Sequence, residues 1–377
     1  MPDVHARFSP SSAERLIHCP PSLRLGEEAE PEETSEYAQE GTEAHSLCEH
    51  LLREKLGEPT KDPRSKLSHY DAEMESCAIR YRDEVCGIYE QLRLEDPETL
   101  ISVEQRVDFS EYADNAFGTS DCIVLGNRHL YVIDFKYGKG VPVSAVENPQ
   151  LKCYALGAYL AFGPLYEIDN ITLFIYQPRI SKFSQFTLTT EELLTWGETV
   201  LKPAADKALK GEGEFSCGSW CKFCRARNIC RKRAEEYLAL AKYDFAPPDT
   251  LEDDEIEDII GKVSQIKDWA EDVKKYALQR ALEGHKWKKW KIVEGRSNRR
   301  FSDEKEAFKK VEEAGFTPYE RKPLTLTGIE ELLGKKKFAE LLGKLVIKPK
   351  GAPTLVPVSD EREEEPNLRE IFSPNTD

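Results

Sequence analysis

Two β-rich runs near the middle of the chain, 119–125 and 129–137, constrain its fold more than any other feature. Gly126-Asn127-Arg128 separates them, and so short a break with these residue types predicts a β-hairpin. If Asn127 and Arg128 form the turn, residue 126 pairs with residue 129, and the rest of the register follows. The chain is therefore expected to build a sheet around this hairpin.

This register brings two carboxylates together, because Asp121 falls opposite Asp134. Lys136 lies two positions after Asp134, so the two side chains point to the same face. Two carboxylates roughly 4 Å apart repel by about 4 kcal/mol at an effective dielectric of about 20, and a lysine or a divalent cation offsets that repulsion. The pattern fits a Mg²⁺ or Mn²⁺ site, and it fits equally a structural Asp–Lys ion pair at a strand end.

The other patterns predict an α/β core with a mixed central sheet flanked by helices. Besides the hairpin, strands are expected at 100–109 and 170–177, and helices at 9–19, 35–55, 66–94, 149–162, 190–210, 251–282 and 329–342. Four parts follow: a main domain at 1–240, a long amphipathic helix at 249–284, a small mixed region at 285–348 and a flexible tail at 349–377. The helix at 251–282 is a candidate for self-association.

The net charge of −16 argues by itself against a nucleic-acid partner, because phosphate contacts need Lys and Arg. The charge is uneven, however: residues 222–233 hold six basic residues and no acidic one, and residues 285–300 hold seven against one Glu. Local patches therefore leave DNA binding open. No apolar run is long enough to predict a membrane span, and the first residues lack the apolar stretch of a signal peptide, so a cytoplasmic protein is expected.

Four short motifs occur in order along the main domain. Taken alone, His45 fits a partly buried helix histidine, and Gln150 and Tyr154 fit ordinary helix residues. The ordered set is Gly41-x-x-x-His45, Gly118-x-x-Asp121, Asp134-x-Lys136 and Gln150-x-x-x-Tyr154. It resembles the RecB-like branch of the PD-(D/E)XK nucleases, whose motifs have these spacings in this order. The resemblance implies a PD-(D/E)XK restriction-endonuclease-like core and a metal-dependent nuclease, most simply a DNA exonuclease.

The same resemblance implies roles for the motif residues. Asp121 and Asp134 would bind Mg²⁺ or Mn²⁺, with His45 and the carbonyl of Phe135 as further ligands. Lys136 would orient or deprotonate the attacking water and stabilise the phosphate, and Gln150 and Tyr154 would hold the DNA strand or that water. Glu104, in the preceding strand, fits a surface position or a supporting contact to the ligands.

The chain has ten cysteines, and four of them lie between residues 217 and 230, which is a spacing typical of metal sites. Cys221-x₂-Cys224-x₅-Cys230 supplies three thiolates, and a closed site needs a fourth. Cys217 is close in sequence and would complete a compact zinc knuckle. Cys19 is the other candidate. The remaining cysteines fit core packing.

The cysteine spacing resembles that of a subset of RecB-like nucleases, which includes AddB and the CRISPR adaptation nucleases. These bind a 4Fe-4S cluster through one cysteine before the nuclease core and three after it. The resemblance implies Cys19, Cys221, Cys224 and Cys230 as ligands, with zinc as the alternative metal. Such a cluster would clip the two ends of the domain together and place basic residues beside DNA, namely Lys222, Arg225, Arg227, Arg231, Lys232 and Arg233.

Trp287 and Trp290 interleave with lysines, which predicts either a strand that stacks on DNA or a strand with one face buried. Over nearly its whole length the chain is also similar to a family of proteins carried mainly by bacteriophages and prophages. That resemblance implies a recombination or replication role in the bacterial host cytoplasm, beside a single-strand annealing or single-strand-binding protein. The alternatives are a non-catalytic or endonucleolytic DNA-binding subunit and a zinc-stabilised adaptor for a phage protein.

Overall fold

The computed structural model describes residues 6–29, 36–140, 142–180, 182–243, 245–293, 304–313, 329 and 333–346. The chain divides into two compact units, Met1–Ile292 and Val293–Asp377. Helices α10 (Glu304–Glu313) and α12 (Lys335–Leu342) and the short 3-10 turn Gly343–Leu345 belong to the second unit. The tail expected at 349–377 lies outside the described residues.

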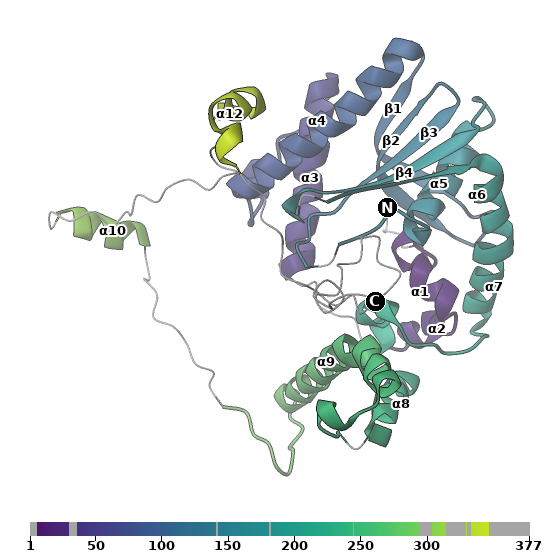
Figure 1. Ribbon diagram of the computed structural model, residues 1–377, viewed down its shortest axis with the longest axis vertical. Coiled ribbons are helices and arrows are strands. Elements are labelled where there is room, and N and C mark those ends of the chain that lie inside the picture. The colour runs from purple at the N-terminus through teal and green to yellow at the C-terminus, as the bar shows by residue number, and fades with distance from the viewer. Residues whose placement is uncertain are drawn as a thin grey trace, which may run out of the picture. The chain divides into compact units, whose positions relative to one another are not determined.

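The first unit is built on one five-stranded sheet whose strands follow their chain order (Figure 1). The strands are β1 (Leu100–Asp108), β2 (Phe117–Gly126), β3 (His129–Phe135), β4 (Asn170–Gln177) and β5 (Lys182–Thr189). β3 and β4 are parallel, and the other neighbouring pairs are antiparallel. The expected α/β core with a mixed sheet is confirmed.

The central hairpin has the predicted register. Asn127 and Arg128 both have positive φ, 51° and 61°, as the two turn residues of a type I′ hairpin require. Gly126 pairs with His129, and Cys122 pairs with Ile133. Continuing that ladder by one residue sets Asp121 against Asp134, as expected from the sequence.

Helices cover both faces of the sheet, and each face has its own hydrophobic core (Figure 1). On one face lie α3 (Glu36–Leu56) and α4 (Ala72–Glu95), which pack on alternate strand residues such as Cys122 and Ile133. The other face is covered by α1 (Ala13–His18), α5 (Pro149–Phe162), α6 (Thr190–Trp196) and α7 (Lys202–Lys210). The apolar residues of the strands are therefore divided between two hydrophobic cores, one on each face of the sheet.

Several elements of the described residues were not predicted. They include α2 (Ser22–Glu27), α8 (Arg231–Leu238), α10, strand β5, and a π-helical turn at Gly197–Leu201 between α6 and α7. The turn precedes Pro203, whose missing N–H and bulky ring disturb the regular α-helical bonding. Polar residues dominate β5, so its apolar signal is weak, and its pairing with β4 is what selects the strand.

The long helix predicted at 251–282 is α9 (Asp253–Leu282). The strand expected around Trp287 and Trp290 is wrong for residues 285–293, which are irregular; residues 294–300 lie outside the described part. Trp287 donates a hydrogen bond to the carbonyl of Ala277 in α9, and Trp290 is 80% exposed. No helix in the described part of the chain is both long and apolar enough to cross a membrane.

Candidate functional site

Residues from all four motifs come together at one end of the sheet. His45 is supplied by α3, Asp121 by β2, and Asp134 by β3, with Lys136 directly after that strand. Gln150 and Tyr154 lie one turn apart on the helix α5. The fold therefore joins chain segments more than a hundred residues apart in one site.

The acidic end of the site centres on Asp121. Its Oδ1 lies 3.1 Å from Nδ1 of His45, and its Oδ2 accepts a 2.7 Å hydrogen bond from the backbone N–H of Phe135. The Phe135 ring also packs edge-on against His45, with ring centroids 5.3 Å apart. Burial alone would lower the pKa of His45, but the Asp121 carboxylate outweighs it and raises that pKa.

Glu104 of β1 completes this acidic end. Three residues, His45, Glu104 and Asp121, each offer one ligand atom. These atoms all lie within 4.8 Å of one another, so the group could hold a metal ion. Burial, followed by repulsion from Asp121, raises the pKa of Glu104 to about 7. Glu104 also has φ of 51°, a strained conformation for a residue with a side chain. Carboxylate oxygens and an imidazole nitrogen suit a hard divalent cation such as Mg²⁺ or Mn²⁺.

Asp134 is buried and lies next to the acidic end. One of its oxygens, Oδ2, is 2.8 Å from the ammonium nitrogen of Lys136. Burial raises the pKa of Asp134, and repulsion from Asp121 adds to the rise although Lys136 opposes it. Burial would lower the pKa of Lys136, but Asp134 reverses the effect, so the lysine stays charged at neutral pH.

Lys136 connects the carboxylates to helix α5. Its ammonium donates a 3.4 Å hydrogen bond to Oε1 of Gln150, whose Nε2 in turn donates at 3.2 Å to the hydroxyl of Tyr154. The Tyr154 hydroxyl therefore acts as an acceptor here and keeps its own proton for a further acceptor. Burial raises the pKa of Tyr154, so that proton is retained at neutral pH.

The two motif glycines have different surroundings. A Cβ on Gly118 would lie 2.6 Å from Cγ of Pro10 and 3.1 Å from a ring carbon of Tyr154. Strand β2 must therefore lack a side chain there for α5 to pack closely. A Cβ on Gly41 in helix α3 would meet nothing within 4 Å.

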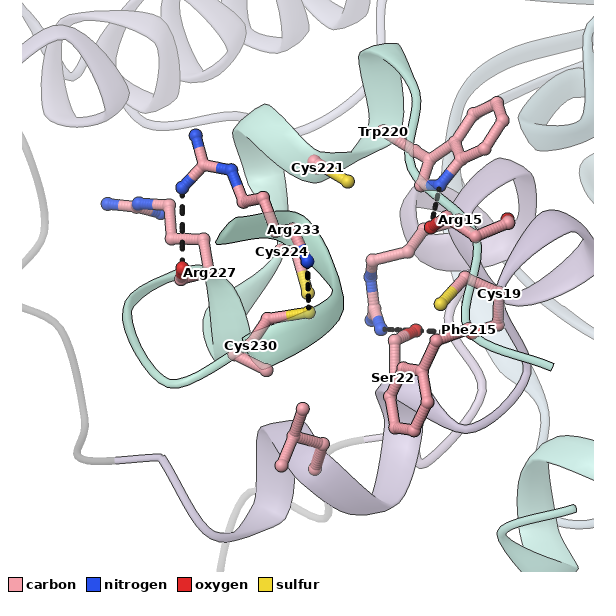
Figure 2. Close-up of a pocket in the computed structure, with 13 residues that line it drawn as sticks. Arg15, Cys19, Ser22, Phe215, Trp220, Cys221, Cys224, Arg227, Cys230 and Arg233 are labelled. Carbon is pink, nitrogen blue, oxygen red and sulfur yellow. Dashed lines mark hydrogen bonds between the residues drawn. The ribbon is translucent and has the colours of Figure 1, made fainter. Parts of the chain in front are cut away.

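A second group of side chains lies where α1 ends. Cys19 follows α1, and it lines one pocket together with Cys221, Cys224 and Cys230 (Figure 2). All four thiols are free. Neighbouring contacts hold the two chain segments together: the Trp220 indole stacks on His18 at 4.3 Å.

Four sulfur donors around one pocket fit a tetrathiolate metal centre, either 4Fe-4S or zinc. The backbone N–H of Arg233 already points at Sγ of Cys230 at 3.4 Å, as backbone donors to thiolates do. Nε of the buried Arg233 side chain has no hydrogen-bond partner among the described residues, although another nitrogen of this guanidinium pairs with Asp272 at 2.6 Å. The pocket wall therefore holds a cationic group with one donor still unsatisfied. A pocket wall of this kind favours a negatively charged metal centre.

Cys217 stands apart from this set. It does not line the pocket, but its thiol hydrogen-bonds to that of Cys221. This bond lowers the pKa of Cys221 to about 6 and raises that of Cys217. Of the two cysteines considered for the fourth position, Cys19 is the one that shares the pocket.

Residues 5–363 match a protein family described as "Protein of unknown function (DUF2800)". The chain belongs to this family. Among solved structures, this DUF2800 chain is similar to one described as "Crystal structure of SSO0001", at 16% identity over 49% of this chain and 94% of the other, with a TM-score of 0.24. At so low a TM-score the likeness supports no conclusion about this chain.

The six basic residues between positions 222 and 233 fall into two groups in this DUF2800 protein. Arg227 and Arg233 both pair with Asp272 of α9, at 3.4 and 2.6 Å, and Arg231 and Lys232 pair with glutamates one turn along α8. The other two, Lys222 and Arg225, are exposed, and within the described part of the chain no ion pair is recorded for either. Among these six, all of which the structure describes, only Lys222 and Arg225 can meet phosphates without breaking an ion pair.

Glu104 is the site residue to which sequence reasoning gave too little weight. The only signal was a lone acidic residue inside a strand pattern, which also fits a surface position. Its place beside Asp121 comes from the pairing of β1 with β2, in which Val103 faces Cys122 and Gln105 faces Ser120.

Proposed function

We propose that this protein is a metal-dependent deoxyribonuclease of the RecB-like type and that its mixed sheet is a PD-(D/E)XK core. One observation carries the proposal: His45, Asp121, Asp134, Lys136, Gln150 and Tyr154 form a single connected set of contacts. If the four motifs matched the family only by chance, their residues would not be expected to lie in contact with one another. A structural ion pair would explain Asp134 and Lys136 alone, but not the crowding of three carboxylates and a histidine.

The residues that would hold the metal are His45, Glu104, Asp121 and Asp134, with the backbone of Phe135 beside them. Repulsion among these carboxylates favours a divalent cation, and it adds to burial in raising the pKa of Glu104. A bound Mg²⁺ or Mn²⁺ would polarise the scissile phosphate and lower the pKa of an attacking water. The Phe135 N–H and His45 fix the orientation of the Asp121 carboxylate before any ligand arrives.

Lys136 has the role of an electrostatic stabiliser. Because Asp134 raises its pKa, the ammonium is charged at neutral pH and cannot serve as a base while the pair is intact. A fixed positive charge, held between Asp134 and Gln150, suits the extra negative charge that develops on a phosphate during hydrolysis. Gln150 keeps the ammonium in place, and Tyr154 retains a proton that it can donate to a phosphate oxygen or a water.

We propose DNA as the substrate and exonucleolytic cleavage as the activity. The similarity to phage- and prophage-encoded proteins supports a role in recombination or replication, in the host cytoplasm beside a single-strand annealing or single-strand-binding protein. DNA ends are the natural substrates of such a role. Lys222 and Arg225, both exposed, are the basic residues that we assign to phosphate contact.

We further propose that Cys19, Cys221, Cys224 and Cys230 bind a 4Fe-4S cluster, with zinc as the alternative. The role of the centre is structural: it would tie residue 19 to residue 221 and so close a long loop around the sheet. Ser216, whose hydroxyl donates to the carbonyl of His18, already supports that closure.

The test is a cleavage assay with linear duplex, circular duplex and single-stranded DNA in the presence of Mg²⁺ or Mn²⁺. The wild-type protein should degrade linear DNA, whereas Asp134→Ala and Lys136→Ala should not. Asp114→Ala, which removes an exposed carboxylate outside the proposed ligand set, serves as the control. Cleavage that survives both active-site substitutions would overturn the assignment. Binding without cleavage by the wild type would favour the non-catalytic subunit, and cleavage of circular DNA would favour an endonuclease.

A further inference from the structure

Three arginines line the pocket of the four cysteines (Figure 2): Arg15 from α1, Arg233 from α8, and Arg227 from the 3-10 turn Arg225–Asn228. Arg15 and Arg233 come from opposite sides of the pocket, one from the segment of Cys19 and the other from the segment of Cys230. Arginine is costly to bury without a partner for its charge. Arginines around the sulfur atoms therefore indicate that the group bound by these atoms is negatively charged.

Arg233 is the most buried of the three, with 1% of its surface exposed. Its backbone N–H points at Sγ of Cys230, and its guanidinium bonds to Asp272 of α9 at 2.6 Å and to the carbonyl of Arg227 at 3.3 Å. Nε remains without a hydrogen-bond partner among the described residues. Asp272 is shared with Arg227, so one carboxylate serves two guanidinium groups and leaves a net positive charge at the pocket wall.

Arg15 points into the pocket, where its guanidinium is drawn between the sulfur of Cys19 and those of the other three cysteines (Figure 2). It donates a 2.6 Å hydrogen bond to the hydroxyl of Ser22, which donates in turn to the carbonyl of Cys19. No carboxylate is recorded as an ion-pair partner of Arg15 within the described residues. Its charge is therefore available to the sulfur atoms.

The charge of a tetrathiolate centre is the same for both candidate metals. Four thiolates around Zn²⁺, or around an oxidised 4Fe-4S core, carry about two net negative charges. Burying such a charge is unfavourable unless cations lie close to it. Arg15, Arg227 and Arg233 carry three formal positive charges, and Asp272 offsets one of them, so two remain to balance the centre.

We propose that Arg15 and Arg233 are positioning residues of the cysteine site, which neutralise the charge of its metal centre, and that Asp272 makes metal retention depend on the docking of α9. The inference rests on the cysteine site proposed above. The coupling follows a short path, from Asp272 through the Arg233 guanidinium to the backbone N–H that meets Cys230. Tyr237 supports the same docking, since its hydroxyl lies 3.3 Å from Oε1 of Gln265 and its ring packs on Trp269.

The experiment uses the full-length protein, purified without oxygen. Iron and zinc are measured per chain, and the rate of metal loss to an excess of chelator is followed by absorbance. Arg15→Met, which keeps bulk and removes charge, should lose metal about tenfold faster or more, whereas Arg15→Lys should stay near the wild-type rate. Asp272→Asn should also speed the loss. Arg231→Ala and Glu271→Gln, exposed neighbours on α8 and α9, should leave the rate unchanged.

Far-UV circular dichroism and thermal unfolding separate folding defects from metal loss. If the centre is 4Fe-4S, Arg15→Met should also shift its reduction potential to a more negative value, which a packing role would not do. Equal rates for Arg15→Met and the wild type would overturn the role of Arg15, as would equal losses for the Met and Lys variants. An unchanged rate in Asp272→Asn would overturn the coupling to α9. A wild type without iron or zinc would remove the cysteine site itself, whereas the DNA cleavage assay would still stand or fall independently.

Discussion

The backbone N–H of Phe135 donates a 2.7 Å hydrogen bond to Oδ2 of Asp121. This bond joins the two strands of the hairpin at the point where their regular ladder ends. It leaves Oδ1 of Asp121 to face His45, so the carboxylate has one oxygen fixed by the backbone and one presented to the candidate metal site. The orientation of the carboxylate is therefore a property of the hairpin and is set before any ligand binds.

Glu104→Gln is expected to weaken binding of Mn²⁺ by about tenfold and to lower cleavage in parallel, because one negative oxygen ligand is lost. Titration calorimetry with Mn²⁺ and no DNA gives the affinity directly. Glu98→Gln, an exposed residue just before β1, is the control. Unchanged affinity in Glu104→Gln would remove Glu104 from the ligand set.

Gly118→Ala is expected to destabilise the protein by about 1–3 kcal/mol, because the new methyl group would overlap Pro10 and press on Tyr154. Cleavage should fall as Tyr154 is displaced. The matched control is Gly41→Ala, which has open space around it in helix α3 and should stabilise by about 0.5–1 kcal/mol. Urea unfolding measures both. A neutral result for Gly118→Ala would show that β2 and α5 can separate at no cost.

Lys222→Ala combined with Arg225→Ala is expected to weaken DNA binding and to reduce the slope of log affinity against log salt by about 2, one unit for each lost phosphate contact. Fluorescence anisotropy in EDTA measures binding without cleavage. Arg231→Ala is the control, because Arg231 is already paired with Glu235. If the double variant keeps the full slope, DNA contacts lie elsewhere on the protein.

Cys19→Ser is expected to abolish metal binding at the cysteine site, and Cys217→Ser is expected to leave the metal content unchanged. The reason is that Cys19 shares the pocket with Cys221, Cys224 and Cys230, whereas Cys217 lies outside it and hydrogen-bonds to Cys221. Metal analysis and the visible spectrum provide the measurement. The reverse pattern would indicate a compact knuckle made of the four cysteines between 217 and 230.

Glu75 should contribute to stability in a pH-dependent way. Two hydrogen bonds from the Arg64 guanidinium, at 3.0 and 2.8 Å, lower its pKa from the ordinary value of 4.5. A lowered pKa stabilises the fold above pH 4.5, and this contribution is lost as the pH falls through the folded-state pKa. Glu75→Gln should therefore cost about 1 kcal/mol at pH 7 and progressively less in acid. Urea unfolding at several pH values is the measurement, and a constant difference down to low pH would contradict it.

The sequence by itself determined the central hairpin and the arrangement of Asp121, Asp134 and Lys136 on it. Asn127 and Arg128 set the turn, and the period of two along a strand then fixes which residues share a face. Both are local properties of a short segment, so no knowledge of distant chain was needed. Helix α5 was also predicted, because its apolar residues and its Pro149 start are equally local.

Only the tertiary structure decided which distant residues join that hairpin. Glu104 enters the acidic group because β1 pairs with β2, and Arg227 and Arg233 are tied to Asp272 because α9 folds back over α8. A run of basic residues thus separates into paired and free members in a way that charge counting cannot reveal. The physical reason is that pairing between strands and burial of charge depend on contacts far apart in the chain, whereas propensity, turn chemistry and periodicity act over a few residues.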